Sequence, residues 1–141
     1  MLSTEPDVIS GQVVDSAIKV HSVIGPGLLE GAYAACLAFE LQDRGIVVRS
    51  QVPLPVNYEG RRIDLAYRID LLVEETVVVE IKAVFRLVPL HQAQLLSYLR
   101  LSGRRVGLLL NFHVPRMRDG IRRIVNGWEV RSPQRSQRAR R

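Results

Sequence analysis

The residues best suited to chemistry are two carboxylates and an amine near the middle of the chain. Side chains alternate between the two faces of a strand, so in a strand over residues 77–84 Glu80 and Lys82 would share one face. The flanking residues are apolar and β-branched, which is typical of a central strand buried on both faces. Charged groups in such a strand are expensive to desolvate. Asp70 ends the preceding apolar run, so the three residues together predict a metal site for phosphodiester chemistry.

Hydrolysis of a phosphodiester requires a metal ion that polarises the phosphate and generates hydroxide. Mg²⁺ prefers oxygen ligands, commonly one or two carboxylates together with water and substrate phosphate. Asp70 and Glu80 would supply the carboxylates, and the Ile81 carbonyl would supply a third oxygen. Lys82 would orient the attacking water or offset charge on the phosphate. The alternative is an ion pair of Lys82 with Asp70 or Glu80 that has no catalytic role.

A short hairpin is expected to place the two carboxylates side by side. The pattern predicts a strand over residues 61–73, a tight turn at Glu74-Glu75 and then the Glu80 strand. Residues 46–58 also alternate and end at a Glu59-Gly60 turn. Two prolines on one side of that segment predict an edge strand, because proline cannot donate to a ladder.

Two helices are expected before the strands. Apolar spacing predicts one over residues 8–21, ended by Gly25-Pro26-Gly27, and a second over residues 28–44, ended by Gly45. His21 lies on the apolar face of the first helix. We therefore expect it to be a core or helix-end histidine rather than a ligand.

Glu30 shares a face of the second helix with Tyr33, Leu37 and Leu41. Two interpretations stay open. Glu30 either points inward and reaches the metal directly or through water, or it is a first-turn acid that interacts with the helix dipole.

The last third of the chain is expected to add a helix, a strand and a final helix. Pro89 and Gly103 bound a helix on which His91, Gln94 and Tyr98 form a polar stripe that would hold substrate or fix Lys82. Residues 105–112 predict an apolar strand. Residues 119–125 predict a short helix, with Trp128 packed at its end. The expected order is α-α-β-β-β-α-β-α in one domain over residues 1–130.

Charge is concentrated at the C-terminal end. The net charge of the 141 residues is +6, yet residues 1–103 carry −3 and residues 104–141 carry +9. Residues 131–141 contain five arginines and no acid, and we expect a disordered basic tail. A basic end on a mildly acidic body suits a polyanionic partner, and solvation of the tail alone is the other interpretation.

Other function classes lack their residues. No apolar run approaches the roughly 18 residues of a membrane span, and the first residues do not resemble a signal peptide. Cys36 is the only cysteine, so an internal disulfide and a cysteine zinc cluster are excluded and a cytoplasmic location is expected. There is no Walker-type phosphate loop, no histidine spacing for zinc and no convincing Ser/His/Asp arrangement.

The same residues resemble a known family. Residues 27–33 fit the GxxExxY signature, Asp70 with Glu80-Ile81-Lys82 fits the D…(D/E)xK core of the PD-(D/E)XK nuclease superfamily, and residues 94–98 resemble the QxxxY motif of its RecB-like branch. The chain is thus similar to GxxExxY proteins over roughly residues 8–126. Ile69 stands where the superfamily motif has its proline.

The resemblance implies an α/β fold with the restriction-endonuclease-like αβββαβ core, a mixed central sheet flanked by helices. It implies Glu30, Asp70, Glu80 and Lys82 as the active site, supported by Gln94 and Tyr98.

Two functions follow as hypotheses. The first is a Mg²⁺- or Mn²⁺-dependent nuclease acting on DNA ahead of RNA, with Arg104 and Arg105 added to the substrate contacts. The second is a catalytically silent module that binds nucleic acid through C-terminal arginines, or a protein partner such as a second copy of the chain. The arginines of the second hypothesis are Arg104, Arg105, Arg116, Arg118, Arg122, Arg123 and those of the tail.

Overall fold

The computed structural model describes residues 3–65 and 67–127. In chain order the elements are α1 (Pro6–Ile24), α2 (Glu30–Asp43), β1 (Val48–Pro53), β2 (Val56–Tyr58), β3 (Arg61–Ile63), β4 (Arg68–Val73), β5 (Val77–Lys82), α3 (Pro89–Ser102), β6 (Val106–Asn111), a 3-10 helix η1 (Met117–Gly120) and β7 (Ile121–Val125). The expectations for Trp128 and for the tail lie outside the described residues. No helix in the described part is long and apolar enough to cross a membrane.

A five-stranded mixed sheet in the order β1-β4-β5-β6-β7 forms the centre of the domain. Strands β5 and β6 are parallel, and the other neighbours are antiparallel. The middle strand β5 is buried from Val77 to Ile81, because helices cover both faces of the sheet. The sheet confirms the predicted α/β class and the central position of the Glu80 strand.

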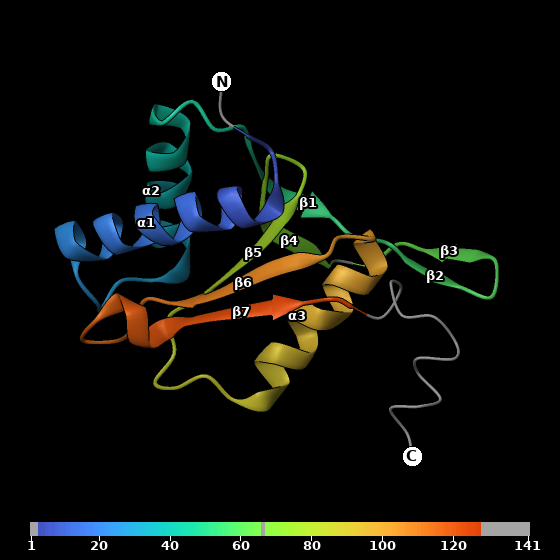
Figure 1. The fold of residues 1–141 in the computed structure, drawn as a ribbon. Coiled ribbons are helices and arrows are strands. Elements are labelled where there is room, and N and C mark those ends of the chain that lie inside the picture. The colour runs from blue at the N-terminus through green and yellow to red at the C-terminus, as the bar shows by residue number, and fades with distance from the viewer. Residues whose placement is uncertain (1–2, 66, 128–141) are drawn as a thin grey trace, which may run out of the picture.

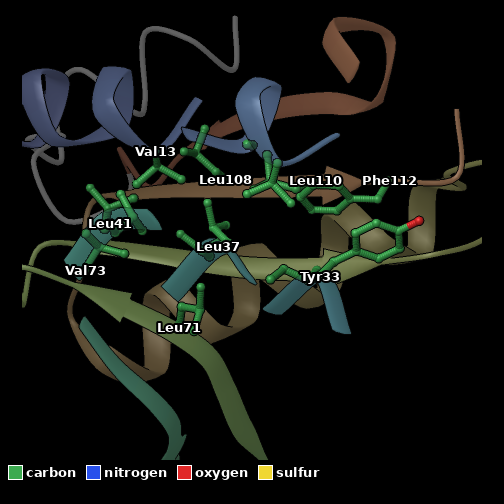
Figure 2. Packing of buried hydrophobic residues seen from close by; sticks show 14 of the residues in the cluster. Val13, Tyr33, Leu37, Leu41, Leu71, Val73, Leu108, Leu110 and Phe112 are labelled. Atoms are coloured by element: carbon green, nitrogen blue, oxygen red, sulfur yellow. The ribbon is translucent and has the colours of Figure 1, made fainter. Parts of the chain in front are cut away.

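The helices form two outer layers, with α1 and α2 on one face and α3 on the other (Figure 1). The α1 and α2 layer packs apolar residues such as Val13, Leu37 and Leu41 against Leu71 and Leu108 (Figure 2). On the opposite face, side chains of α3 pack against β4, β5 and β6; this cluster consists of Leu54, Ile69, Leu72, Val78, Leu95, Leu99 and Leu109. Alternation along β5 therefore sends neighbouring residues into two different cores.

The β4–β5 turn brings the expected strands together. Glu74 and Glu75 have positive φ angles of 52° and 56°, and the Thr76 N–H donates to the Val73 carbonyl at 3.0 Å. Residues 74–76 connect the two strands, so Val73 pairs with Val77 and Leu71 with Val79. Left-handed backbone is costly for residues other than glycine. The carboxylates of this turn offset the cost: Glu74 accepts a hydrogen bond from the Val47 N–H at 2.7 Å, and Glu75 accepts one from Arg49 at 2.6 Å.

The expected strand over residues 46–58 is wrong in its length. It ends at Pro53, and residues 56–58 pair instead with residues 61–63 in a separate two-stranded ribbon. The expected strand over residues 61–73 is divided in the same way between β3 and β4. Pro53 and Pro55 lack the N–H groups that a continuous ladder would need. The prediction of an edge strand is confirmed, because β1 is an outer strand of the sheet.

The expected helix over residues 119–125 is also wrong. Residues 117–120 form the 3-10 helix, and residues 121–125 are strand β7, antiparallel to β6 with Leu110 opposite Ile121. Three apolar residues around two arginines, in a segment of five, do not distinguish helix from strand. The backbone N–H and C=O groups of β6 on that side need partners, and pairing with β7 supplies them.

Gly120 offers a test of this packing. A Cβ atom there would lie 2.1 Å from the Asn111 carbonyl oxygen, which belongs to the backbone of β6 and cannot move aside. Gly120→Ala should therefore lower the free energy of unfolding, measured by urea denaturation, by about 1–3 kcal/mol. Gly11→Ala is the control, because Gly11 lies in α1 with no atom within 4 Å of that position, and alanine there should raise stability by about 0.5–1 kcal/mol. Equal stability of Gly120→Ala and wild type would contradict the contact.

Candidate active site

Asp70 and Glu80 are joined by two reciprocal hydrogen bonds across strands β4 and β5. The Asp70 carboxylate accepts a bond from the Ile81 N–H at 2.8 Å, and the Glu80 carboxylate accepts one from the Asp70 N–H at 2.9 Å. The pairing of the two strands runs only as far as Leu71 opposite Val79, so side-chain oxygens replace backbone partners just beyond it. Each carboxylate is thereby held by one oxygen in a defined orientation.

A main-chain carbonyl lies on the same edge of β5 as this pair. Within the described chain, the structure gives no hydrogen bond to the second oxygen of Asp70 or of Glu80. The N–H and C=O groups of one strand residue point to the same edge, so the Ile81 carbonyl faces β4 as its N–H does. The prediction that the hairpin brings Asp70 near Glu80 is confirmed by their hydrogen bond, and the Ile81 carbonyl as a third metal oxygen stays a prediction.

Glu80 has a strongly altered acidity. Its side chain is buried on the α3 face of the sheet, and burial is the largest cause that raises its pKa to about 8. The negative charges of Asp70 and Glu30 raise this pKa further, while the Asp70 N–H and the Lys82 charge oppose the rise. A divalent cation beside Glu80 would favour the ionised form.

Lys82 lies two residues beyond Glu80 on the same strand and is partly exposed. Among the described residues it forms no ion pair within 4.0 Å, so the structure does not show the expected alternative of an Asp70–Lys82 or Glu80–Lys82 bridge. Its charge still lowers the pKa of Glu80. The ammonium is therefore near the carboxylates and free to meet an anion.

Glu30 begins α2, and its side chain is exposed. The expectation that Glu30 points into the protein is therefore wrong. The buried residues of α2 begin one turn later, at Tyr33. Its charge nevertheless reaches the site, since it raises the pKa of Glu80. Glu30 is thus a first-turn acid of α2 that also contributes charge to the carboxylate pair.

Tyr33 holds the loop that leads into Glu30. Its hydroxyl donates to the Gly25 carbonyl at 2.6 Å and accepts from the Leu28 N–H at 3.1 Å. Its ring lies against that of Phe112 (Figure 2), and the two are stacked with centroids 4.5 Å apart. The buried tyrosine therefore anchors the start of α2 against the end of β6.

Asn111 is a positioning residue that the sequence pattern did not reveal. It is 1 % exposed at the end of β6, opposite Lys82. Its amide accepts from the Val84 N–H and donates to the Val84 carbonyl, both at 3.0 Å. This pair of bonds fixes the chain as it leaves β5. The detectable signal is one asparagine ending an otherwise apolar run, which is weak without the fold.

The predicted polar stripe on α3 is only partly near the carboxylates. Tyr98 is half-buried, and burial, Glu80, Tyr67 and Asp70 all raise its pKa, in that order. Gln94 is exposed one turn earlier on the helix. His91 is engaged at the start of α3, where its Nδ1 accepts from the Val88 N–H at 3.0 Å.

Arg104 and Arg105 lie at the opposite end of the sheet from Lys82. They precede β6, whose first residue Val106 pairs with Val77, whereas Lys82 pairs with Asn111. Arg104 forms an ion pair with Glu75 of the β4–β5 turn at 3.2 Å. The structure therefore does not bring these two arginines to the carboxylates.

The donor set suits a metal ion that keeps much of its water. Among residues 3–65 and 67–127, no group of three or more His, Cys, Asp or Glu side chains is close enough to hold a metal. Two carboxylates and the Ile81 carbonyl remain, which is the modest number of protein oxygens typical of Mg²⁺ sites. His21 is not part of it, because its Nε2 lies 2.7 Å from the Val114 carbonyl.

Comparison with known proteins agrees with this geometry. A family model described as the PD-(D/E)XK nuclease superfamily matches residues 7–124, which span α1 to β7. No curated protein and no solved structure matches the chain significantly.

The raised pKa of Glu80 predicts a pH-dependent stability. Because the folded pKa of about 8 exceeds the ordinary value of 4.5, the folded state holds the proton longer, and this group destabilises the fold increasingly from pH 4.5 to 8. Glu80→Gln should therefore nearly match wild type near pH 5 and exceed its free energy of unfolding at pH 9 by on the order of 5 kcal/mol, since the pKa rises from 4.5 to about 8 and each pKa unit corresponds to about 1.4 kcal/mol.

Urea denaturation at pH 5 and pH 9, without divalent metal, measures this difference. Glu75→Gln is the control, because Arg49 lowers the pKa of the exposed Glu75 and the substitution should not stabilise the protein at high pH. A Glu80→Gln variant no more stable than wild type at pH 9 would contradict the burial of an acid at this position.

Proposed function

Because this chain belongs to the PD-(D/E)XK nuclease superfamily, we propose that it is a metal-dependent nuclease that hydrolyses phosphodiester bonds in DNA, ahead of RNA. One observation carries the proposal. Asp70 and Glu80 hold each other across two strands, and the Lys82 charge is close enough to lower the pKa of Glu80. We further propose a place among GxxExxY proteins, supported by Glu30 at the start of α2 and by Tyr33 behind it, and a cytoplasmic location.

The metal in this proposal is Mg²⁺ or Mn²⁺, since nucleases of the superfamily generally use divalent metals. Asp70, Glu80 and the Ile81 carbonyl would hold the ion, with Glu30 acting through water. Such an ion, when bound, polarises the phosphate and lowers the pKa of bound water. Lys82 orients the attacking water or binds a phosphate oxygen, and its charge opposes the negative charge that develops there.

The remaining polar residues have supporting roles in the proposal. Tyr98 lies near the carboxylates and would contact substrate, with Gln94 and His91 further along α3. Arg104 and Arg105 stay as proposed contacts to a longer nucleic acid, away from the reacting phosphate. Asn111 keeps the chain after Lys82 in place.

Three near-isosteric substitutions test the catalytic assignment. Asp70→Asn, Glu80→Gln and Lys82→Met should each reduce Mg²⁺-dependent cleavage of a DNA substrate at least about 10²-fold, the typical effect of removing one group that stabilises transition-state charge. Circular dichroism establishes that each variant is folded. Glu75→Gln, at the other end of β5, should cleave like wild type. Retained cleavage by purified Glu80→Gln would refute the assignment.

Metal binding should depend on pH in a defined way. A pKa of about 8 for Glu80 means that below pH 8 an incoming cation must displace one proton. The affinity for Mn²⁺ measured by calorimetry should therefore rise about tenfold from pH 6 to pH 7 and level off above pH 8. Glu80→Gln should abolish the binding, and a pH-independent affinity would contradict Glu80 as a ligand.

A silent nucleic-acid-binding module is the second candidate function. Arg86 and Arg122 favour it, because they line a cavity of about 280 Å³ beside Asn111 in which Asp119 is the one acid among the described residues. The excess of positive charge there would attract phosphate without a metal. Other arginines are already paired, as Arg116 is with Asp119 at 3.5 Å and Arg123 is with Asp7. Binding that persists in chelator and weakens steeply with salt, without any cleavage, would favour this function.

A further inference from the structure

The β2–β3 ribbon projects from the domain without a covering layer (Figure 1). It is a separate two-stranded sheet in which Tyr58 pairs with Arg61 and Val56 with Ile63. Tyr58 is 62 % exposed and Ile63 is 39 % exposed. A two-stranded ribbon is marginally stable by itself, so its exposed apolar and aromatic side chains are not accounted for by the core of the domain.

The base of the ribbon adjoins the candidate active site. Tyr67 follows β3 and lies against Tyr98 of α3, with ring centroids 6.1 Å apart. Its carbonyl accepts a bond from the Leu54 N–H at 2.9 Å, which ties the two ends of the ribbon together. Arg68 then begins β4 and lies two residues before Asp70, about 7 Å along the strand.

The ribbon and its base carry cations that the protein does not neutralise. Arg62 is paired with Asp64 at 2.9 Å. Within the described chain, neither Arg61 nor Arg68 has a carboxylate within 4.0 Å, and both are exposed. An exposed guanidinium without a protein partner is well suited to bind phosphate oxygens.

We propose that the β2–β3 ribbon, with Tyr67 and Arg68 at its base, is an arm that binds single-stranded nucleic acid and leads it to Asp70. Bases stack on Tyr58 and Tyr67, and phosphates lie on Arg61 and Arg68. Unpaired bases are required because in a duplex their faces are already stacked. The proposal deepens the proposed function by naming an unpaired strand as its substrate, and it rests on that function for the direction toward Asp70.

The test measures binding apart from cleavage. A fluorescein-labelled single-stranded DNA 20-mer is titrated with the full chain in EDTA, and anisotropy is followed at several salt concentrations. Tyr58→Ala should weaken binding about tenfold, within the range found for removal of one stacking partner. Arg61→Gln should weaken binding and reduce the slope of log affinity against log salt by about 0.7.

Matched controls keep the test specific. Phe39→Ala removes a 69 % exposed aromatic from α2, on the other layer of the domain, and Arg62→Gln removes the arginine that is already paired. Both should bind like wild type, and all variants should match it in urea denaturation. Wild-type affinity of both Tyr58→Ala and Arg61→Gln would overturn the proposal.

Other occupants of the ribbon would give other results, each of which overturns the arm. Equal binding of a duplex of the same sequence, weakened equally by Tyr58→Ala, would indicate groove binding by the ribbon. A wild-type dimer in sedimentation that becomes a monomer in Tyr58→Ala, with unchanged DNA affinity, would indicate that a second copy of the chain binds the ribbon.

The arm and the nuclease function can fail separately. If the expected losses of DNA binding occur while metal-dependent cleavage is absent, the proposed arm is supported and the proposed nuclease function is refuted.

Discussion

The reciprocal hydrogen bonds between Asp70 and Glu80 are the interaction on which the candidate site depends. Each carboxylate accepts the N–H group of the other strand, Ile81 for Asp70 and Asp70 for Glu80. The bonds continue the β4–β5 connection just past its last backbone pair and satisfy donors that would otherwise lack partners. They also hold two acidic groups close together, which the metal-free protein tolerates because Glu80, with a pKa of about 8, retains its proton and is uncharged at neutral pH.

That arrangement needs a rigid surrounding. Val77, Val79 and Ile81 pack into the α1 and α2 layer, while Val78 packs under α3. The strand between them therefore has little freedom to shift. Burial of Glu80 in this strand is unfavourable for an anion, and a divalent cation would reverse that disadvantage. The buried Glu80 carboxylate thus lowers the stability of the metal-free fold, and the same group provides a ligand for the metal.

The surroundings of the site are held by side chains that do no chemistry. Tyr33 ties the loop before Glu30 to Gly25 and Leu28, and Asn111 ties the chain after Lys82 to Val84. Tyr33 and Asn111 lie on different elements, but both act near the end of β6, where Phe112 stacks on Tyr33. Contacts at the C-terminal end of β6 therefore hold in place both the loop before Glu30 and the chain after Lys82.

The sequence by itself determined the central strand, the short hairpin and the neighbouring carboxylates, because the alternation of side chains and a short turn are local properties. It also determined the α/β class and the superfamily. It did not determine the ends of elements that rely on distant partners. Strand β7 exists because β6 needs hydrogen bonds, and β1 is separated from β2 near two prolines whose effect depends on the sheet beside them.

Tertiary structure alone decided which predicted site residues meet. Arg104 and Arg105 are only a few residues from Asn111 in sequence, yet the parallel pairing of β5 with β6 puts them at the far end of the sheet from Lys82. Asn111 itself, and the contact of Tyr67 with Tyr98, arise from segments distant in sequence. Local pattern specifies the strand that carries Glu80, whereas long-range packing specifies everything that surrounds it.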